Sequence, residues 1–237
     1  MGAELNYPAF GADYSVQILA ACVTRYHGHT EDVFMDPNSI DWSALEQPQE
    51  IAHEFEIDLY NAVIANHNAM LEGIDREEEG EMLEIKDSFP VEDYDRVGSM
   101  LGYVESGYDE RRQKARLSAV VVIVTRLEHW LSRFARQLNV KPTPVHKTLL
   151  GNLIEALNNT LGVGPVPAKF FDDLAELRHS VTHANSQAEW DFKGKRRSVA
   201  DFYRNAWGDA ELSEEQLKEA FQKSIQQVKW YDEKMPG

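Results

Sequence analysis

The chain has 237 residues, of which 43% are apolar, 10% aromatic and 27% charged, and its formal net charge is -16. This composition is typical of a globular protein with a substantial core, and the length permits one large domain or two small ones. A chain this acidic repels nucleic acid as a whole, so any RNA contact is expected at a local site or in a cleft formed by assembly.

The sequence also indicates where the protein resides. The longest apolar run, residues 119–124, is far shorter than the roughly 18 residues that span a bilayer. The N-terminal sequence lacks the basic and then apolar segments of a signal peptide. The single cysteine, Cys22, excludes a disulfide framework and a cysteine-rich zinc site. We therefore expect a cytoplasmic protein with no membrane partner.

The apolar pattern favours helices almost throughout, and no alternating strand pattern occurs before residue 187. Residues 14–27 and 49–71 are predicted to be helical, whereas the acidic residues 73–95 are predicted to form a solvated connection. We assign residues 1–95 to an N-terminal helical extension with an acidic loop, packed on the rest. Residues 96–237 are assigned to the main helical bundle.

The strongest pattern predicts a long helix over about 108–137. Apolar residues recur there at alternating spacings of three and four, which is typical of a helix packed along its whole length. These seam residues are Leu117, Val120, Val124, Leu127, Leu131, Phe134 and Leu138.

Three further helices are predicted after it. Thr143 and Pro144 are a plausible cap and first turn for a helix to about residue 161, and Pro167 begins the next, to about residue 187. Residues 188–209 are expected to hold a hairpin or an ordered loop. Ser213 with Gln216 predicts a capping box for the last helix. Together these elements predict an all-α antiparallel helical bundle.

The sequence ELRHSVTHAN, residues 176–185, carries the candidate chemistry: Arg178, His179 and His183. Cleaving RNA requires a base for the 2′-hydroxyl proton, a cation for the charge that develops on phosphorus, and an acid for the leaving oxygen. Histidine exchanges protons near neutral pH, and arginine stays charged and presents a planar fork to phosphate oxygens. These residues therefore suit phosphodiester cleavage that needs neither a metal nor a cofactor.

The order arginine, polar residue, then histidine after four to six positions, late in a helical bundle, resembles the HEPN superfamily of prokaryotic helical nucleases and nucleotide-binding proteins. The resemblance covers about residues 108–233. It implies a metal-independent endoribonuclease with no cofactor, in which Arg178 and His183 are catalytic and His179 supports them. It also implies a homodimer, a toxin, antiviral-defence or RNA-processing setting, and an inhibitory protein partner.

Helical geometry separates the two main residues of this motif. Five positions place Arg178 and His183 about 140° apart around the axis and about 7.5 Å apart along it. His183 shares a polar stripe with Asp172, Glu176 and His179, whereas Arg178 flanks the apolar stripe. In the family, dimerisation joins two such helices in one cleft. Asp172 and Glu176 are expected to orient the histidines.

Other interpretations of the same residues stay open. Arg178 can pair with Glu176 or another acid, and His183 can be an ordinary surface histidine. The basic residues Lys193, Lys195, Arg196 and Arg197 suit an RNA backbone with aromatic rings nearby, but they equally suit a solvated loop tip. The fold is also compatible with a non-catalytic module that holds a nucleotide or a protein.

A metal-binding bundle is a third alternative. The Glu-x-x-His step of di-iron bundles occurs twice, at Glu50 with His53 and at Glu176 with His179. A complete site needs two more inward carboxylates, for which Glu105 or Glu128 can be nominated. Such pairs arise readily by chance in a chain rich in glutamate, so the signal is weak.

Overall fold

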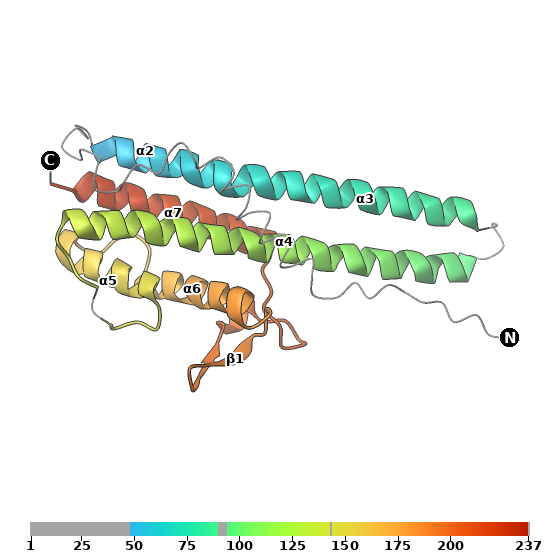
Figure 1. The fold of residues 1–237 in the computed structure, drawn as a ribbon. Coiled ribbons are helices and arrows are strands. Elements are labelled where there is room, and N and C mark those ends of the chain that lie inside the picture. Colours follow the sequence, from blue (N-terminus) through green and yellow to red (C-terminus); the bar gives the residue numbers. More distant parts are fainter. Residues whose placement is uncertain (1–47, 90–93, 143, 237) are drawn as a thin grey trace, which may run out of the picture. The chain divides into compact units, whose positions relative to one another are not determined.

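The computed structural model describes residues 48–89, 94–142 and 144–236, which are mainly helical (Figure 1). The predicted all-α helical bundle is therefore confirmed. One small two-stranded sheet follows helix α6 (Ala168–His183) in this part of the chain. The predicted helix over residues 14–27, and Cys22 within it, lie outside the described residues.

The first described element is one continuous helical run. It consists of α2 (Pro48–Leu59), the π-helical turn η2 (Tyr60–Ala65) and α3 (Asn66–Ser88). The predicted helix over residues 49–71 is confirmed, but the predicted connection over 73–95 is wrong as far as Ser88, because α3 continues to that residue.

Packing against α4 explains why the acidic segment is helical. Ile74 is buried with Val104 and Tyr108 of α4. Glutamates on α3 pair with arginines on α4: Glu77 accepts from Arg111 at 2.7 Å, and Glu78 accepts from Arg112. Glutamate is also a good helix former. The acidic side chains therefore stabilise a helix instead of marking a loop.

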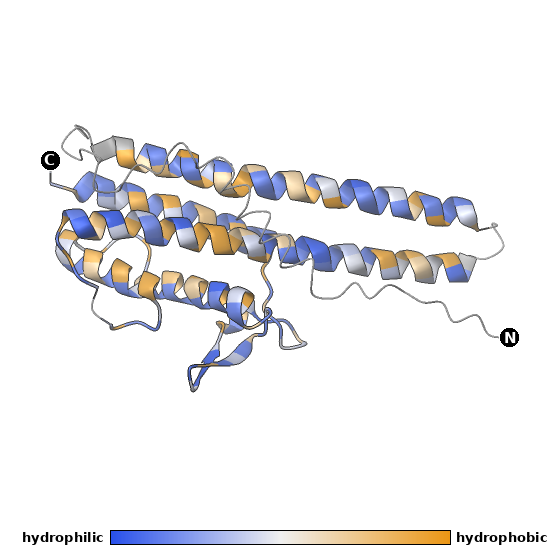
Figure 2. Ribbon diagram, in the orientation of Figure 1, coloured by the Kyte–Doolittle hydropathy of each residue, from blue (hydrophilic) through white to orange (hydrophobic). Residues whose placement is uncertain are grey.

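The long predicted helix is α4 (Tyr94–Gln137), which begins fourteen residues before the expected start. The predicted seam residues inside it are buried. Leu138 follows the helix and is half-buried. In Figure 2 apolar residues gather in the part of α4 beside α5 and α7, whereas α3 is largely polar. Helix α4 packs against α3, α5, α6 and α7, so it is the central element of the bundle.

Helix α5 (Leu149–Leu161) begins later than predicted: Pro144 precedes the helix, and Thr143 lies outside the described residues. Thr148 is the cap, and its hydroxyl accepts from Gly151 N at 3.1 Å. Asp172 Oδ1 accepts from Thr148 N at 2.9 Å and from its hydroxyl at 2.7 Å. A contact from the following helix therefore sets where α5 begins.

The predicted hairpin is confirmed by β1 (Glu189–Phe192) and β2 (Lys195–Ser198), which pair antiparallel. Lys193 and Gly194 form the turn, with φ values of 51° and 74°. Positive φ at both central residues is the geometry of a tight hairpin turn that matches strand twist. After a 3-10 turn, η4 (Asp201–Tyr203), helix α7 (Glu214–Lys234) begins with the predicted capping box.

The described residues from Pro48 onward form one compact unit, in which the helical run 48–88 packs with the other helices. The assignment of residues 1–95 to an N-terminal extension stays a prediction. Helix α2 packs on α7, and Ala52 N donates to Asp232 Oδ2 at 3.0 Å. Among the described helices, none has the length and apolar character needed to cross a membrane.

Candidate functional site

The carboxyl end of helix α6 (Ala168–His183) carries the motif residues. The helix buries Phe171, Leu174 and Leu177 in the bundle. Its last turn is fastened by Ser180, whose hydroxyl donates to Gln187 O at 2.7 Å. The helix ends at His183, four residues before the predicted end, so the final motif histidine lies at the exit of the helix.

Arg178 is oriented by a carboxylate from the central helix. Its Nη1 donates to Glu128 Oε2 at 2.6 Å, and both side chains are mostly buried, with 17% and 15% of their surface exposed. The predicted alternative that Arg178 pairs with an acid is therefore correct, but the acid is Glu128 of α4 and not Glu176. Nη2 of Arg178 lies 3.3 Å from His179 Nε2.

His179 lies between two arginines. Arg197 Nη1, from strand β2, approaches its Nδ1 at 2.8 Å, and Arg178 approaches the other ring nitrogen. Burial, followed by the positive charges of Arg178 and Arg197, lowers the pKa of His179 to about 4. His179 is therefore neutral at neutral pH and does not serve there as a proton donor in its charged form.

His183 is exposed and lies beside His179, with 5.9 Å between the ring centroids. Its ring centroid is 5.7 Å from that of Phe192 on β1. His179 thus contacts both Arg178 and His183, which the helical geometry separates. The structure brings the three predicted catalytic residues together through this middle histidine.

The two predicted supporting carboxylates differ. Glu176 is 3% exposed and pairs with Arg197 at 3.3 Å, whereas its Oε2 lies 4.0 Å from His179 Nδ1. Burial raises the pKa of the Glu176 carboxyl, and Arg197 opposes this. Asp172 hydrogen-bonds Thr148 at the start of α5. Glu176 thus contacts Arg197, which in turn approaches His179, while Asp172 fastens the start of α5 to α6 and its charge favours protonation of His179.

The four basic hairpin residues divide between two surroundings. Lys193, Lys195 and Arg196 are exposed, and Arg196 pairs with Glu189 at 2.5 Å. Arg197 instead points to α6. Arg197 is opposite buried Trp190 and shares a face of the hairpin with Phe192, whose ring lies against His179 and His183 at the end of α6. The alternation of these two aromatic residues is the sequence signal that could have placed Arg197 at the site.

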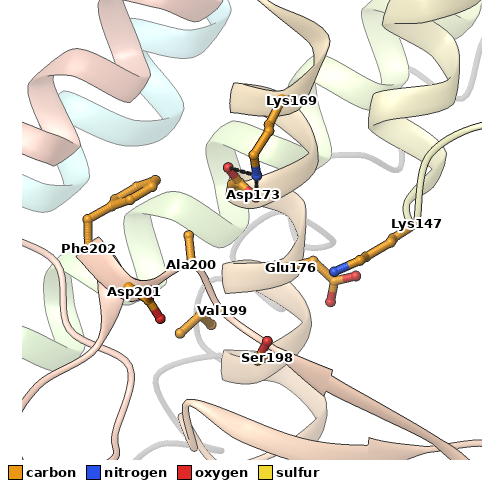
Figure 3. Close-up of a pocket in the computed structure, with 9 residues that line it drawn as sticks. All are labelled: Lys147, Lys169, Asp173, Glu176, Ser198, Val199, Ala200, Asp201 and Phe202. Carbon is orange, nitrogen blue, oxygen red and sulfur yellow. Dashed lines mark hydrogen bonds and ion pairs between the residues drawn. The ribbon is translucent and has the colours of Figure 1, made fainter.

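A hollow of about 370 Å³ lies next to the cluster of Arg178, His179 and His183. Glu176 is one of the residues that line this hollow (Figure 3). Lys169 is held there by both carboxylate oxygens of Asp173 at 2.8 Å. Lys147 and Phe202 line other parts of the hollow. Sequence reasoning missed it because its residues come from three separate segments, 147, 169–176 and 198–202. Two lysines and three carboxylates line it, so negative charge slightly outnumbers positive charge.

The nominated metal residues do not converge in the described part of the chain, where no group of three or more His, Cys, Asp or Glu side chains could hold a metal ion. Glu105 and Glu128 are on the same helix and about 35 Å apart along its axis. Glu128 is instead engaged by Arg178.

A comparison of the chain with protein-family models finds no match, and comparisons with curated proteins and with solved structures also find none. The HEPN resemblance therefore stays a prediction from the motif residues and their place in a helical bundle.

Proposed function

We propose that this protein is a HEPN-like, metal-independent endoribonuclease whose reacting groups lie at the carboxyl end of α6. The observation that carries the proposal is the grouping of Arg178, His179 and His183 at one place, beside the ring of Phe192. Arginine and imidazole nitrogens suit a phosphate, and an aromatic ring suits the adjoining base. The cluster also places the guanidinium of Arg178 at a local site on a chain whose net charge is -16.

In the proposed reaction the 2′-oxygen of a ribose attacks the adjacent phosphorus, and the bond from phosphorus to the 5′-oxygen of the next nucleotide breaks. His183, an exposed imidazole of the cluster, takes the proton of the 2′-hydroxyl. Arg178 donates hydrogen bonds to the phosphoryl oxygens as negative charge develops. The products are a 2′,3′-cyclic phosphate and a free 5′-hydroxyl.

The leaving 5′-oxygen must receive a proton. Because His179 is neutral between its two arginines, it is a poor acid for this step. The resemblance implies a homodimer, and we assign the role to His183 of the second copy. An inhibitory protein partner and a toxin or antiviral setting follow from the same resemblance and belong to the proposal.

The hairpin extends the proposed contact to the rest of the RNA. Lys193 and Lys195 are exposed near its tip, where their ammonium groups can contact backbone phosphates. Lys193 Nζ lies 5.2 Å from the centre of the Phe192 ring, so a phosphate contact and a stacking surface adjoin each other.

The decisive experiment incubates the purified protein with RNA in EDTA and analyses the product ends. We expect cleavage by the wild type and a loss of roughly 100-fold or more for Arg178→Ala and for His183→Ala. Arg111→Ala is the matched control for Arg178, because Arg111 also pairs with a glutamate, and His53→Ala is an exposed-histidine control. Both controls are expected to cut like the wild type. Equal cleavage by all five proteins would refute the assignment.

A non-catalytic binding module is the second candidate, and one observation favours it: Nη1 of Arg178 is already occupied by Glu128. In that case the wild type binds RNA or a nucleotide without cutting it. Fluorescence anisotropy with a labelled RNA, in the same buffer as the cleavage assay, separates the two candidates. Binding without any product assigns the binding role, and binding with cyclic-phosphate product assigns the nuclease.

A further inference from the structure

The protonation of His179 follows from its two neighbours. Arginine nitrogens only donate hydrogen bonds, and a neutral imidazole has one N–H and one acceptor nitrogen. Of the two arginine contacts, the one from Arg197 Nη1 to Nδ1 is the shorter, at 2.8 Å against 3.3 Å, so we assign Nδ1 as the acceptor. This assignment puts the proton of the neutral ring on Nε2.

With that tautomer, two donors face each other. His179 Nε2–H and Arg178 Nη2 are 3.3 Å apart, and neither can accept from the other. Arg178 cannot simply turn away, because Glu128 holds its Nη1 at 2.6 Å. An oxygen atom of an anion placed beside both nitrogens would accept a hydrogen bond from each. Both donors would then have an acceptor.

We propose that Arg197 is a positioning residue that fixes His179 as a neutral Nε2–H donor, so that His179 and Arg178 jointly bind one phosphate oxygen. The identity of that phosphate as part of RNA rests on the proposed function, whereas the anion site does not. In this proposal His179 acts as a hydrogen-bond donor and not as a supporting proton-transfer group. Arg197 orients His179 and does not contact the RNA backbone.

The surroundings of Arg197 support this role. Its Nη1 also lies 3.3 Å from buried Glu176, and its guanidinium carbon lies 5.3 Å from the centre of the Phe192 ring. Its Nη2 reaches the carbonyl oxygen of Lys147 at 3.5 Å. Three elements thus hold one guanidinium in place, and its side chain is 20% exposed.

The charges that face His179 agree with a neutral ring. On α6 these are Arg178 and His183, which oppose protonation, and Asp172, which favours it. Glu176 is also near, at 4.0 Å, but it is paired with Arg197. From the other elements, Arg197 of β2 opposes protonation, and Glu128 of α4 reaches the ring only through Arg178. An added proton would face an arginine on each side.

The test reads the tautomer directly, by ¹⁵N NMR of labelled histidines at pH 7. For the wild type we expect the His179 signals of an Nε2–H ring. In Arg197→Ala we expect a mixture of tautomers and a higher His179 pKa, because the Nδ1 partner and one positive charge are removed. Arg196→Ala is the matched control, since Arg196 lies next in the strand but pairs with exposed Glu189, and it should leave the tautomer unchanged.

Inorganic phosphate is the probe for the anion site. Added to the wild type, it should move the His179 Nε2 signal in a saturable manner, and Arg178→Ala or Arg197→Ala should weaken this binding about tenfold. Circular dichroism confirms that each variant is folded. If RNA is cut, Arg197→Ala should lower kcat/KM, in part through a higher KM, because the contact with the bound phosphate is weakened.

Several results would overturn the inference. A wild-type ring protonated on Nδ1, or charged at pH 7, contradicts the tautomer assignment even if every variant unfolds. A His179 Nε2 signal that does not move when phosphate is added contradicts the anion site. Failure of RNA cleavage alone, with tautomer and phosphate results as expected, refutes the proposed nuclease and leaves the anion site standing.

Discussion

Two parts of the molecule bring arginines against carboxylates, with different consequences. Between α3 and α4, Arg111 meets Glu77 at 2.7 Å, and the side chains are 39% and 60% exposed. At α6, Arg178 meets Glu128 at 2.6 Å with 17% and 15% exposed. The distances are nearly equal, but water screens the first pair and hardly reaches the second. The two pairs therefore differ in burial. The exposed pair lies on a helix surface, whereas the buried pair holds the Arg178 side chain in position.

The largest difference is expected when a carboxylate is removed from each pair. Glu128→Ala leaves mostly buried Arg178 without its partner and should lower the free energy of unfolding by about 3 kcal/mol. Glu77→Ala, at the exposed pair, should lower it by under about 1 kcal/mol. Urea unfolding followed by circular dichroism measures both. Similar losses for the two variants would show that burial does not distinguish these regions.

The next effect depends on pH. The pKa of His179 is about 4 in the folded protein against an ordinary value of 6.5, so the unfolded chain takes up the proton first as pH falls. The free energy of unfolding should therefore decrease from pH 6.5 to pH 4, by about 2 to 3 kcal/mol, with no such contribution above pH 6.5.

His179→Gln should remove this part of the pH dependence. His53→Gln, at an exposed histidine of α2, provides the comparison and should retain it. Thermal or urea unfolding measured at intervals between pH 4 and pH 7 gives both curves. The prediction fails if wild type and His179→Gln lose stability in parallel.

A smaller contrast concerns two glycines. Gly194, with a φ of 74°, completes the hairpin turn, so Gly194→Ala should lower the free energy of unfolding by about 1 kcal/mol. Gly80 is inside α3, where an added Cβ meets no atom within 4 Å. Gly80→Ala should therefore raise the free energy of unfolding by about 0.5 to 1 kcal/mol. Denaturant unfolding should show opposite signs for the two changes.

The smallest effect is the coupling within the exposed pair. A double-mutant cycle on Arg111 and Glu77 should give about 0.5 kcal/mol at low salt and almost nothing in 1 M NaCl. The same cycle on Arg178 and Glu128 should give a larger coupling that salt reduces little, because those side chains are mostly buried. A salt-sensitive coupling at Arg178 would indicate that water reaches that pair in solution.

Much of the fold could be predicted because its signals are local. The seam of α4, the capping box at Ser213 and the hairpin after residue 188 each depend on residues within a few positions of one another. Local signals do not predict the helix in the acidic stretch, because that helix depends on α4, about 35 residues away along the chain. The start of α5 is hidden from the local sequence for a similar reason, since Asp172 reaches it from α6.

The candidate site also combines residues that a local sequence pattern identifies with partners that are distant along the chain. The residues of ELRHSVTHAN name the reacting groups, and helical spacing alone separates Arg178 from His183 around the axis. The partners that orient them come from elsewhere: Glu128 is 50 positions from Arg178, and Arg197 is 18 positions from His179. Periodicity and capping act between near neighbours and can be recognised along a chain. Pairing of distant charges depends on which helices and strands meet, and that is known only once the bundle has formed.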